Sequence, residues 1–159
     1  MSDALGTVER ALLDGAQLEP ADDVLVLGGG ALVFGAQERV GEGWVYVVRS
    51  QVDELEELLG EAHAVGATGV AYLVGEAPVL PLPDGAVAAA LGRIALDDGA
   101  LAAAAAELAR VLADGGRVAL AEPAWDAANE LAEALRGAGL GTLELAGAGG
   151  EVVVTGRLG

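Results

Sequence analysis

The sequence predicts an α/β protein in which a mostly parallel sheet lies between two layers of helices. Segments typical of strands and of helices alternate along the chain, and this alternation builds βαβ units. Residues 24–27 are apolar at every position, as expected of a strand that is buried on both faces of a parallel sheet. The short glycine loop "AGAGG" joins the last two strand-type segments and favours an antiparallel pair. We therefore expect five parallel strands followed by an antiparallel hairpin at the edge.

Hydrophobic periodicity and turn residues define the individual elements. The expected strands cover residues 24–27, 44–48, 69–74, 86–91, 117–123, 141–145 and 151–157. The expected helices cover residues 4–13, 32–40, 52–65, 99–113 and 126–136. Three prolines and an Asp-Gly pair mark residues 77–85 as a loop, and Gly137 ends the last helix.

Ser50 and the single histidine both have structural explanations in the helix expected over residues 52–65. Ser50 and Asp53 have the spacing of a capping box, in which the serine side chain accepts a hydrogen bond from the first helical turn. His63 falls at the edge of an apolar stripe made of Leu55, Leu58, Leu59 and Ala62. A Ser-His-Asp triad would have to use both Ser50 and His63, so we expect no catalysis of that kind.

Composition excludes several classes of function. A chain of 159 residues is expected to form one domain, with residues 1–20 as a first helix and lead-in. The formal charge is −17 and all eight basic residues are scattered arginines, so we expect no nucleic-acid partner. No apolar run reaches the ~18 residues of a membrane span and no signal peptide is recognisable, which predicts a cytoplasmic protein without membrane contact. With one histidine, no cysteine and no lysine, we expect no metal site, thiolate nucleophile or Schiff base.

Two segments resemble the class I S-adenosylmethionine-dependent methyltransferases, and most closely the small-molecule enzymes of the ubiquinone/menaquinone type. They are "GEAPVLPLPDGAVAAALGRIALDD" and "ALAAAAAELARVLADGGRVALAEP", and the most specific part is "RVLADGGRVALAEP", residues 110–123. The resemblance extends from about Ala21 to the C-terminus. It implies a Rossmann-like three-layer sandwich with a seven-stranded sheet and an antiparallel last strand. It also implies S-adenosylmethionine as the cofactor.

The stretch "VLVLGGGALVFGAQ", residues 24–37, is typical of a strand, a glycine turn and a helix. In the family such a turn lets the cofactor approach the backbone, because glycine has no side chain to push it away. The resemblance implies that Glu76 receives the adenine amino group. It places the cofactor-binding positions at Gly28, Gly29, Gly30, Arg49, Glu76 and Ala77. The alternative is that the three glycines only form a close-packed corner between strand and helix.

Three carboxylates that the family carries are replaced in this chain. The acidic position in the first strand is Val26, and the acidic position at the start of the fourth strand is Ala88. About 20 residues beyond Gly28, the position that binds the ribose hydroxyls is Arg49. Arginine donates hydrogen bonds and accepts none, so it cannot replace the carboxylate.

Two smaller departures accompany these replacements. Ala31 or Leu32 takes the place of the last motif glycine, and Asp97 and Asp98 take the place of histidines that some relatives carry. Together the departures predict a degenerate methyl-donor site in a non-catalytic scaffold or partner subunit, with a protein partner or a homo-oligomer. In such a protein we expect side chains such as Leu32 or Phe34 to fill the donor cavity.

Two alternatives stay open. An active methyltransferase for a small molecule would need little acid–base catalysis, because its sulfonium donor is reactive and the protein chiefly aligns the reactants. An NADP-binding domain would use Arg49 for the 2′-phosphate, although the G-x-G-x-x-G spacing from Gly28 ends at Val33.

Overall fold

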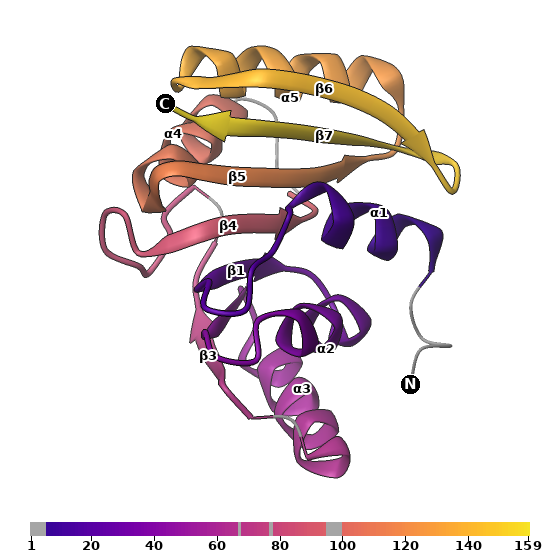
Figure 1. Ribbon diagram of the computed structural model, residues 1–159, viewed down its shortest axis with the longest axis vertical. Coiled ribbons are helices and arrows are strands. Elements are labelled where there is room, and N and C mark those ends of the chain that lie inside the picture. Colours follow the sequence, from indigo (N-terminus) through magenta and orange to yellow (C-terminus); the bar gives the residue numbers. More distant parts are fainter. Residues whose placement is uncertain (1–5, 67, 77, 95–99) are drawn as a thin grey trace.

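A single seven-stranded sheet organises the computed structural model, which describes residues 6–66, 68–76, 78–94 and 100–159 (Figure 1). The strand order is β3-β2-β1-β4-β5-β7-β6. β1 to β5 are parallel, whereas β7 is antiparallel to both of its neighbours, β5 and β6. The predicted fold class and the antiparallel last strand are therefore confirmed. The hairpin of β6 and β7 lies at one edge of the sheet, as predicted, with β6 outermost and β7 between β5 and β6.

The described part of the chain contains seven strands and five helices in the predicted order. The strands are β1 Val24–Leu27, β2 Val45–Arg49, β3 Val70–Val74, β4 Val87–Gly92, β5 Leu112–Glu122, β6 Leu140–Ala148 and β7 Glu151–Leu158. The helices are α1 Thr7–Gly15, α2 Gly30–Arg39, α3 Val52–Val65, α4 Leu101–Val111 and α5 Trp125–Gly137. The first two residues of the first helix as predicted, residues 4 and 5, lie outside the described residues.

β5 begins earlier than residue 117, where the sequence predicts it. Leu112 already pairs with Val87, and the register then shifts before Arg117 pairs with Ala89. The "DGG" segment therefore forms an irregular stretch inside β5, where Gly115 has a φ of 76°. A glycine adopts this left-handed conformation without a steric penalty, so the chain can bulge here and still return to the sheet.

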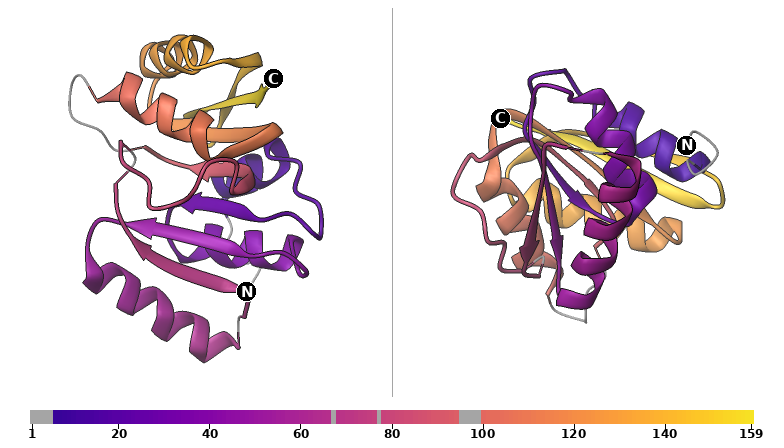
Figure 2. Two further views of the ribbon diagram at one scale, coloured as in Figure 1. Left: turned by 90° about the vertical axis from the view of Figure 1, so that its left-hand side faces the viewer. Right: turned by 90° about the horizontal axis from the view of Figure 1, so that it is seen from below.

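The two faces of the sheet carry separate hydrophobic cores because neighbouring residues of a strand point in opposite directions. Val24 and Val26 of β1 pack with α1, α2 and α3 on one face. Leu25 and Leu27 pack with α4 and α5 on the other. Figure 2 shows the two helix layers with the sheet between them.

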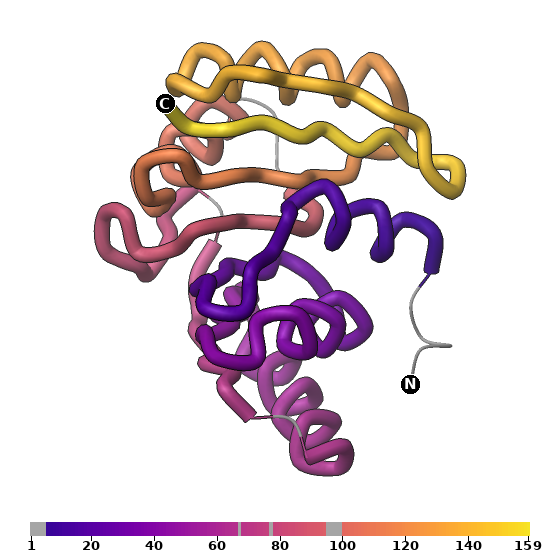
Figure 3. The backbone as a smooth tube through the Cα atoms, in the orientation of Figure 1, coloured from indigo at the N-terminus to yellow at the C-terminus, as the bar shows by residue number. Residues whose placement is uncertain are grey.

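The order in which the strands are added to the sheet reverses at β1. From β1 the chain extends outward through β2 to β3, and it then crosses back to place β4 on the other side of β1 (Figure 3). A crevice at the carboxyl ends of the strands is expected at such a reversal, between β1 and β4.

None of the helices in the described ranges combines the length and the apolar character that crossing a bilayer requires.

Candidate functional site

An open cavity lies where the strand order reverses, at the carboxyl ends of β1, β2 and β4. We call it the strand-end cavity. Its volume is ≈ 690 Å³, which is within the range of roughly 300–1,000 Å³ that is usual for small-molecule sites. It is lined by Leu27, Gly28, Gly29, Val48, Arg49, Ser50, Glu54, Gly75, Glu76, Pro78, Arg93, Ile94 and Ala100.

The glycine turn forms one wall of this cavity. Gly28 and Gly29 alone connect β1 to α2, and both line the cavity. A methyl group on Gly29 would meet no atom within 4 Å, whereas one on Gly30 would collide with the carboxylate of Glu61 on α3. Gly30 is not among the lining residues, and the atom nearest to an added methyl group is the end of the exposed, flexible Glu61 side chain. The turn therefore forms part of the cavity wall at Gly28 and Gly29.

The N-terminus of α2 lies at the edge of the strand-end cavity. Gly29 is the N-cap residue, and the N–H of Val33 makes the first hydrogen bond of the helix, to the Gly29 carbonyl at 3.1 Å. The backbone N–H groups before Val33 have no partner within the helix, and the helix dipole makes this end positive. The arrangement suits an anionic group such as a carboxylate.

Side chains of α2 do not fill the cavity, so that expectation is wrong. Leu32 is only 2% exposed and belongs to the core between the sheet and the first three helices. Phe34 packs against the same core, and neither residue lines the cavity. The physical reason is that α2 buries its apolar residues against the sheet and leaves only its N-terminus at the strand ends.

Arg49 enters the cavity as part of an ion pair that the sequence does not predict. It is the last residue of β2, and its Nε donates to Oε2 of Glu54 at 3.0 Å. Its Nη1 donates to the carbonyl of Gly28 at 2.7 Å. The guanidinium group therefore connects the glycine turn to the first turn of α3. Through this ion pair the carboxylate of Glu54 lies beside the end of β2, where the family carries an acidic residue and this chain carries Arg49.

Glu76 also lines the cavity, beyond the end of β3. It forms an isolated antiparallel β-bridge with Val79, so the loop after β3 begins with a tight turn. Ala77, the remaining predicted position, lies outside the described residues. Of the six predicted cofactor positions, the structure thus places Gly28, Gly29, Arg49 and Glu76 on one cavity.

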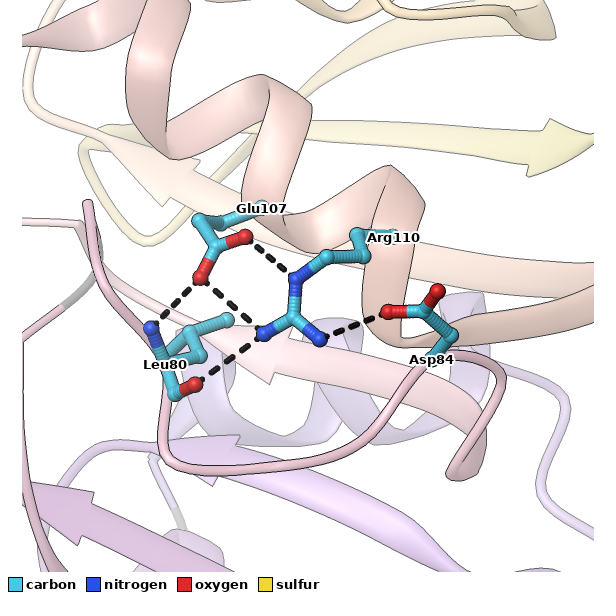
Figure 4. Close-up of polar contacts among 4 residues, drawn as sticks. All are labelled: Leu80, Asp84, Glu107 and Arg110. Atoms are coloured by element: carbon cyan, nitrogen blue, oxygen red, sulfur yellow. Dashed lines mark hydrogen bonds and ion pairs between the residues drawn. The ribbon is translucent and has the colours of Figure 1, made fainter.

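The loop that carries Glu76 is anchored by a cluster on α4, shown in Figure 4. Arg110 donates to the Leu80 carbonyl at 3.0 Å, to Asp84 at 2.9 Å and to both carboxylate oxygens of Glu107. Glu107 in turn accepts the Leu80 N–H at 2.8 Å. Hydrogen bonding from Arg110 lowers the pKa of Glu107, against the opposing effect of burial, with a further contribution from the Leu80 N–H. The loop is therefore fixed through both the N–H and the carbonyl group of Leu80.

Arg93 occupies the opposite end of the cavity, just after β4. Its Nε and Nη2 donate to the two carboxylate oxygens of Glu151 at 2.9 and 2.6 Å, and Nη2 lies 3.5 Å from Glu9. The hydrogen bond with Glu151 is the main cause that raises the pKa of Arg93 and lowers the pKa of Glu151. Arg93 thus connects α1 to the start of β7 beside the cavity. With Arg49, Glu54 and Glu76, it gives the lining two positive and two negative side chains.

Val26 and Ala88, two of the other family positions, do not line the cavity. Val26 is fully buried in β1, and Ala88 lies near the amino end of β4, where its N–H donates to the Asp23 carbonyl at 2.8 Å. A carboxylate at Ala88 would therefore not reach the strand-end cavity. Asp97 and Asp98 lie outside the described residues.

The predicted capping role of Ser50 is wrong. The N-cap residue of α3 is Gln51, and it makes no side-chain capping hydrogen bond. Ser50 instead lines the cavity, because β2 ends at Arg49 and the chain turns there. His63 lies exposed near the end of α3 and does not line the cavity. Across the described ranges, no three acidic or histidine side chains gather into a group that could bind a metal ion.

Sequence reasoning missed Glu54, Arg93 and Pro78 as lining residues. Glu54 and Arg93 follow the carboxyl ends of β2 and β4, and ligands of open parallel sheets bind at such ends. That rule could have identified both residues from the predicted strand boundaries.

Similarity to known proteins is found among solved structures. No protein-family model matches this chain, and no curated protein matches it by sequence. Among solved structures, a SAM-dependent methyltransferase from Aquifex aeolicus has a TM-score of 0.80 at 21% identity, covering 98% of this chain and 92% of that one. A chain from the complex between the Trm112 methyltransferase activator of Haloferax volcanii and its methyltransferase partner has a TM-score of 0.79 at 18% identity, covering 94% and 88%.

A third structure, a geranyl diphosphate methyltransferase in complex with GPP and sinefungin, has a TM-score of 0.75 at 18% identity. It covers 94% of this chain and 77% of that one. At these identities the similarity is one of architecture. The chain therefore has the fold of the class I S-adenosylmethionine-dependent methyltransferases.

Proposed function

We propose that the strand-end cavity binds S-adenosylmethionine and that the chain transfers its methyl group to a small molecule. The observation that carries this proposal is the open cavity of ≈ 690 Å³ at the strand ends, with glycine on one wall and two glutamates in its lining. A site lost during divergence would be expected to be filled by side chains, and Leu32 and Phe34 pack elsewhere.

The residues of the cavity suit the parts of this methyl donor. Glu76 would accept the adenine amino group, and the N-terminus of α2 would receive the carboxylate of the methionine part. When bound, the sulfonium supplies a methyl group that is reactive without acid–base help, so alignment is the main task of the protein. This explains how a cavity without histidine, cysteine or lysine could support transfer. The formal charge of −17 also attracts a ligand that carries a sulfonium and an ammonium group.

Isothermal titration calorimetry with S-adenosylmethionine and with S-adenosylhomocysteine tests the proposal. We expect saturable binding of both ligands, together with thermal stabilisation. At a ligand concentration of 100 times Kd, stabilisation should reach about 2.7 kcal/mol. NADPH should give neither effect, because Arg49 is held by Glu54 and the Gly28 carbonyl. Absence of heat and of stabilisation at millimolar S-adenosylmethionine and S-adenosylhomocysteine would refute donor binding.

A second candidate function, association with a further copy of this chain, is supported by the exposed edge of the sheet. β3 is an edge strand, and the exposed fractions of Val74 and Val79 are 53% and 75%. Apolar residues beside an unpaired edge are typical of surfaces that pair with another chain. Sedimentation velocity on the wild type and on a Val74→Arg/Val79→Arg variant tests self-association through this edge. A wild-type dimer that becomes monomeric in the variant would support it, and a monomeric wild type would contradict it.

A further inference from the structure

We infer that Glu54 supplies the carboxylate that the end of β2 lacks, and that it accepts hydrogen bonds from the ribose hydroxyls of the adenosyl ligand. This inference rests on the proposed binding of S-adenosylmethionine. It makes Glu54 the residue that recognises the sugar and Arg49 a positioning residue.

The location of Glu54 fits this role. It lies in the first turn of α3, five residues beyond Arg49, and it lines the strand-end cavity. Its side chain is 41% exposed, so a ligand in the cavity can reach the carboxylate. Of the other acidic residues in the first two turns of α3, Asp53, Glu56 and Glu57 are exposed and none lines the cavity. The carboxylate next to the end of β2 therefore comes from α3 in this chain, and not from the last residue of the strand.

Arg49 holds the carboxylate of Glu54 in place. Its Nε lies 3.0 Å from Oε2 of Glu54, while Nη1 is fixed to the Gly28 carbonyl at 2.7 Å. Because Gly28 belongs to the glycine turn, the guanidinium group sets the position of Glu54 relative to the wall that a nucleoside would contact. The same contacts oppose a 2′-phosphate, because two acceptors already engage Arg49 and the negative charge of Glu54 lies next to it.

The hydrogen-bonding capacity of Glu54 matches the two hydroxyls of a ribose. In the described part of the chain, its side-chain hydrogen bond with Arg49 uses Oε2 only. An ionised carboxylate offers about four acceptor positions on two oxygens, so Oε1 and the second position of Oε2 can accept two further hydrogen bonds. Neighbouring 2′- and 3′-hydroxyls each donate one.

Glu76 is the other carboxylate of the lining, and it lies on a different element. It follows β3, whereas Glu54 follows β2, so the two carboxylates approach the cavity from adjacent strand ends. This separation lets one contact the base and the other the sugar. An adenosine part that spans both positions would be recognised at each end.

Calorimetry with S-adenosylhomocysteine and its 2′-deoxy analogue tests the inference on the wild type, Glu54→Gln and the matched control Glu57→Gln. We expect Glu54→Gln to weaken binding of S-adenosylhomocysteine about 10- to 100-fold, because ribose hydroxyls lose a charged acceptor. The deoxy analogue should bind more weakly than S-adenosylhomocysteine in the wild type and in Glu57→Gln. In Glu54→Gln this difference should largely vanish. Thermal melting confirms that each variant is folded.

Arg49→Gln completes a double-mutant cycle. We expect it to weaken binding in the wild type and to have little further effect when Glu54→Gln is already present, because Arg49 acts through Glu54. Equal affinity of Glu54→Gln and the wild type, or an unchanged preference for the ribose hydroxyl, would overturn the inference while leaving donor binding intact. A wild type that binds no S-adenosylhomocysteine at millimolar concentration would overturn both proposals.

Discussion

Gly29 is a residue at which ligand binding and fold stability can be tested separately. Its missing side chain faces open space in the strand-end cavity, whereas Gly28 and Gly30 would bring a methyl group against Leu32 and Glu61. Its φ of −90° is open to any residue, so no backbone strain requires glycine here. Glycine at this position therefore keeps this part of the cavity wall free of a side chain.

We expect Gly29→Ala to weaken S-adenosylhomocysteine binding about tenfold or more, because the added methyl group would occupy the cavity wall. The free energy of unfolding should fall by no more than about 1 kcal/mol, the cost of alanine at an N-cap position. Calorimetry and chemical denaturation measure the two effects separately.

Gly60→Ala is the matched control. Gly60 lies exposed within α3 with open space around it, so alanine should raise the free energy of unfolding by roughly 0.5–1 kcal/mol and leave affinity unchanged. Equal ligand affinity in Gly29→Ala and the wild type would show that the turn does not contact the ligand.

At the scale of elements, the anchoring of the loop after β3 to α4 connects fold stability to the site. Arg110 and Glu107 hold the backbone of Leu80 from both sides, and the same loop begins with Glu76 at the cavity. The Glu107–Arg110 pair has a three-residue helical spacing, and so does the pair of Glu133 and Arg136 on α5. The two pairs differ in environment: the side chain of Glu107 is 18% exposed, and that of Glu133 is 76% exposed.

We expect Glu107→Gln to lower the free energy of unfolding at pH 7 by about 1.5–3 kcal/mol, since a hydrogen bond between charged groups is lost. The pKa of Glu107 is lower in the folded chain than its ordinary value, so the stabilisation is fully present above that ordinary value. It is lost as the pH falls through the folded pKa. The difference between variant and wild type should therefore shrink in urea denaturation carried out at successively more acidic pH.

Glu133→Gln provides the comparison at the exposed pair, where we expect a change of no more than about 0.5 kcal/mol at pH 7. A loss as large as that of Glu107→Gln would mean that burial of the pair is not what strengthens the anchor. A pH-independent loss in Glu107→Gln would contradict the role of its charge.

At the scale of the whole molecule, negative charge is the dominant long-range feature. Asp and Glu number 25 against eight arginines, so most carboxylates have no cationic partner available. Their mutual repulsion opposes the compact state. The few exposed ion pairs contribute little against this excess.

We expect Tm to rise as NaCl is increased from about 0.01 M to about 1 M, because the screening length falls from about 30 Å to about 3 Å. Differential scanning calorimetry measures this shift. KCl should give the same curve if screening is the cause, and a flat or falling Tm would show that repulsion does not limit stability.

The overall fold was predictable from the sequence because it depends on features that repeat along the chain. Apolar strands, helices between them and glycine turns determine the alternation, and the short glycine loop predicts the antiparallel hairpin at the edge. The irregular start of β5 was not predictable, since the register shift near Gly115 depends on pairing with β4.

The cavity was predictable only in part, for a related reason. Gly28, Gly29 and Arg49 follow from the glycine turn and from counting, Glu76 follows from the family resemblance, and all four line the cavity. The Arg49–Glu54 pair depends on how two side chains meet across the turn between β2 and α3, which no spacing rule fixes. The capping role of Ser50 failed at the same turn, because α3 begins one residue later than the capping pattern requires.

The position of β7 has a consequence for the order in which the chain can assemble. β6 is held in the sheet through β7, which separates it from β5. During synthesis, residues 140–148 leave the ribosome before the strand that must lie between them and the rest of the sheet. β6 can therefore join the sheet only together with β7 or after it, and a nascent chain that stops before residue 151 leaves β6 without a neighbour to pair with.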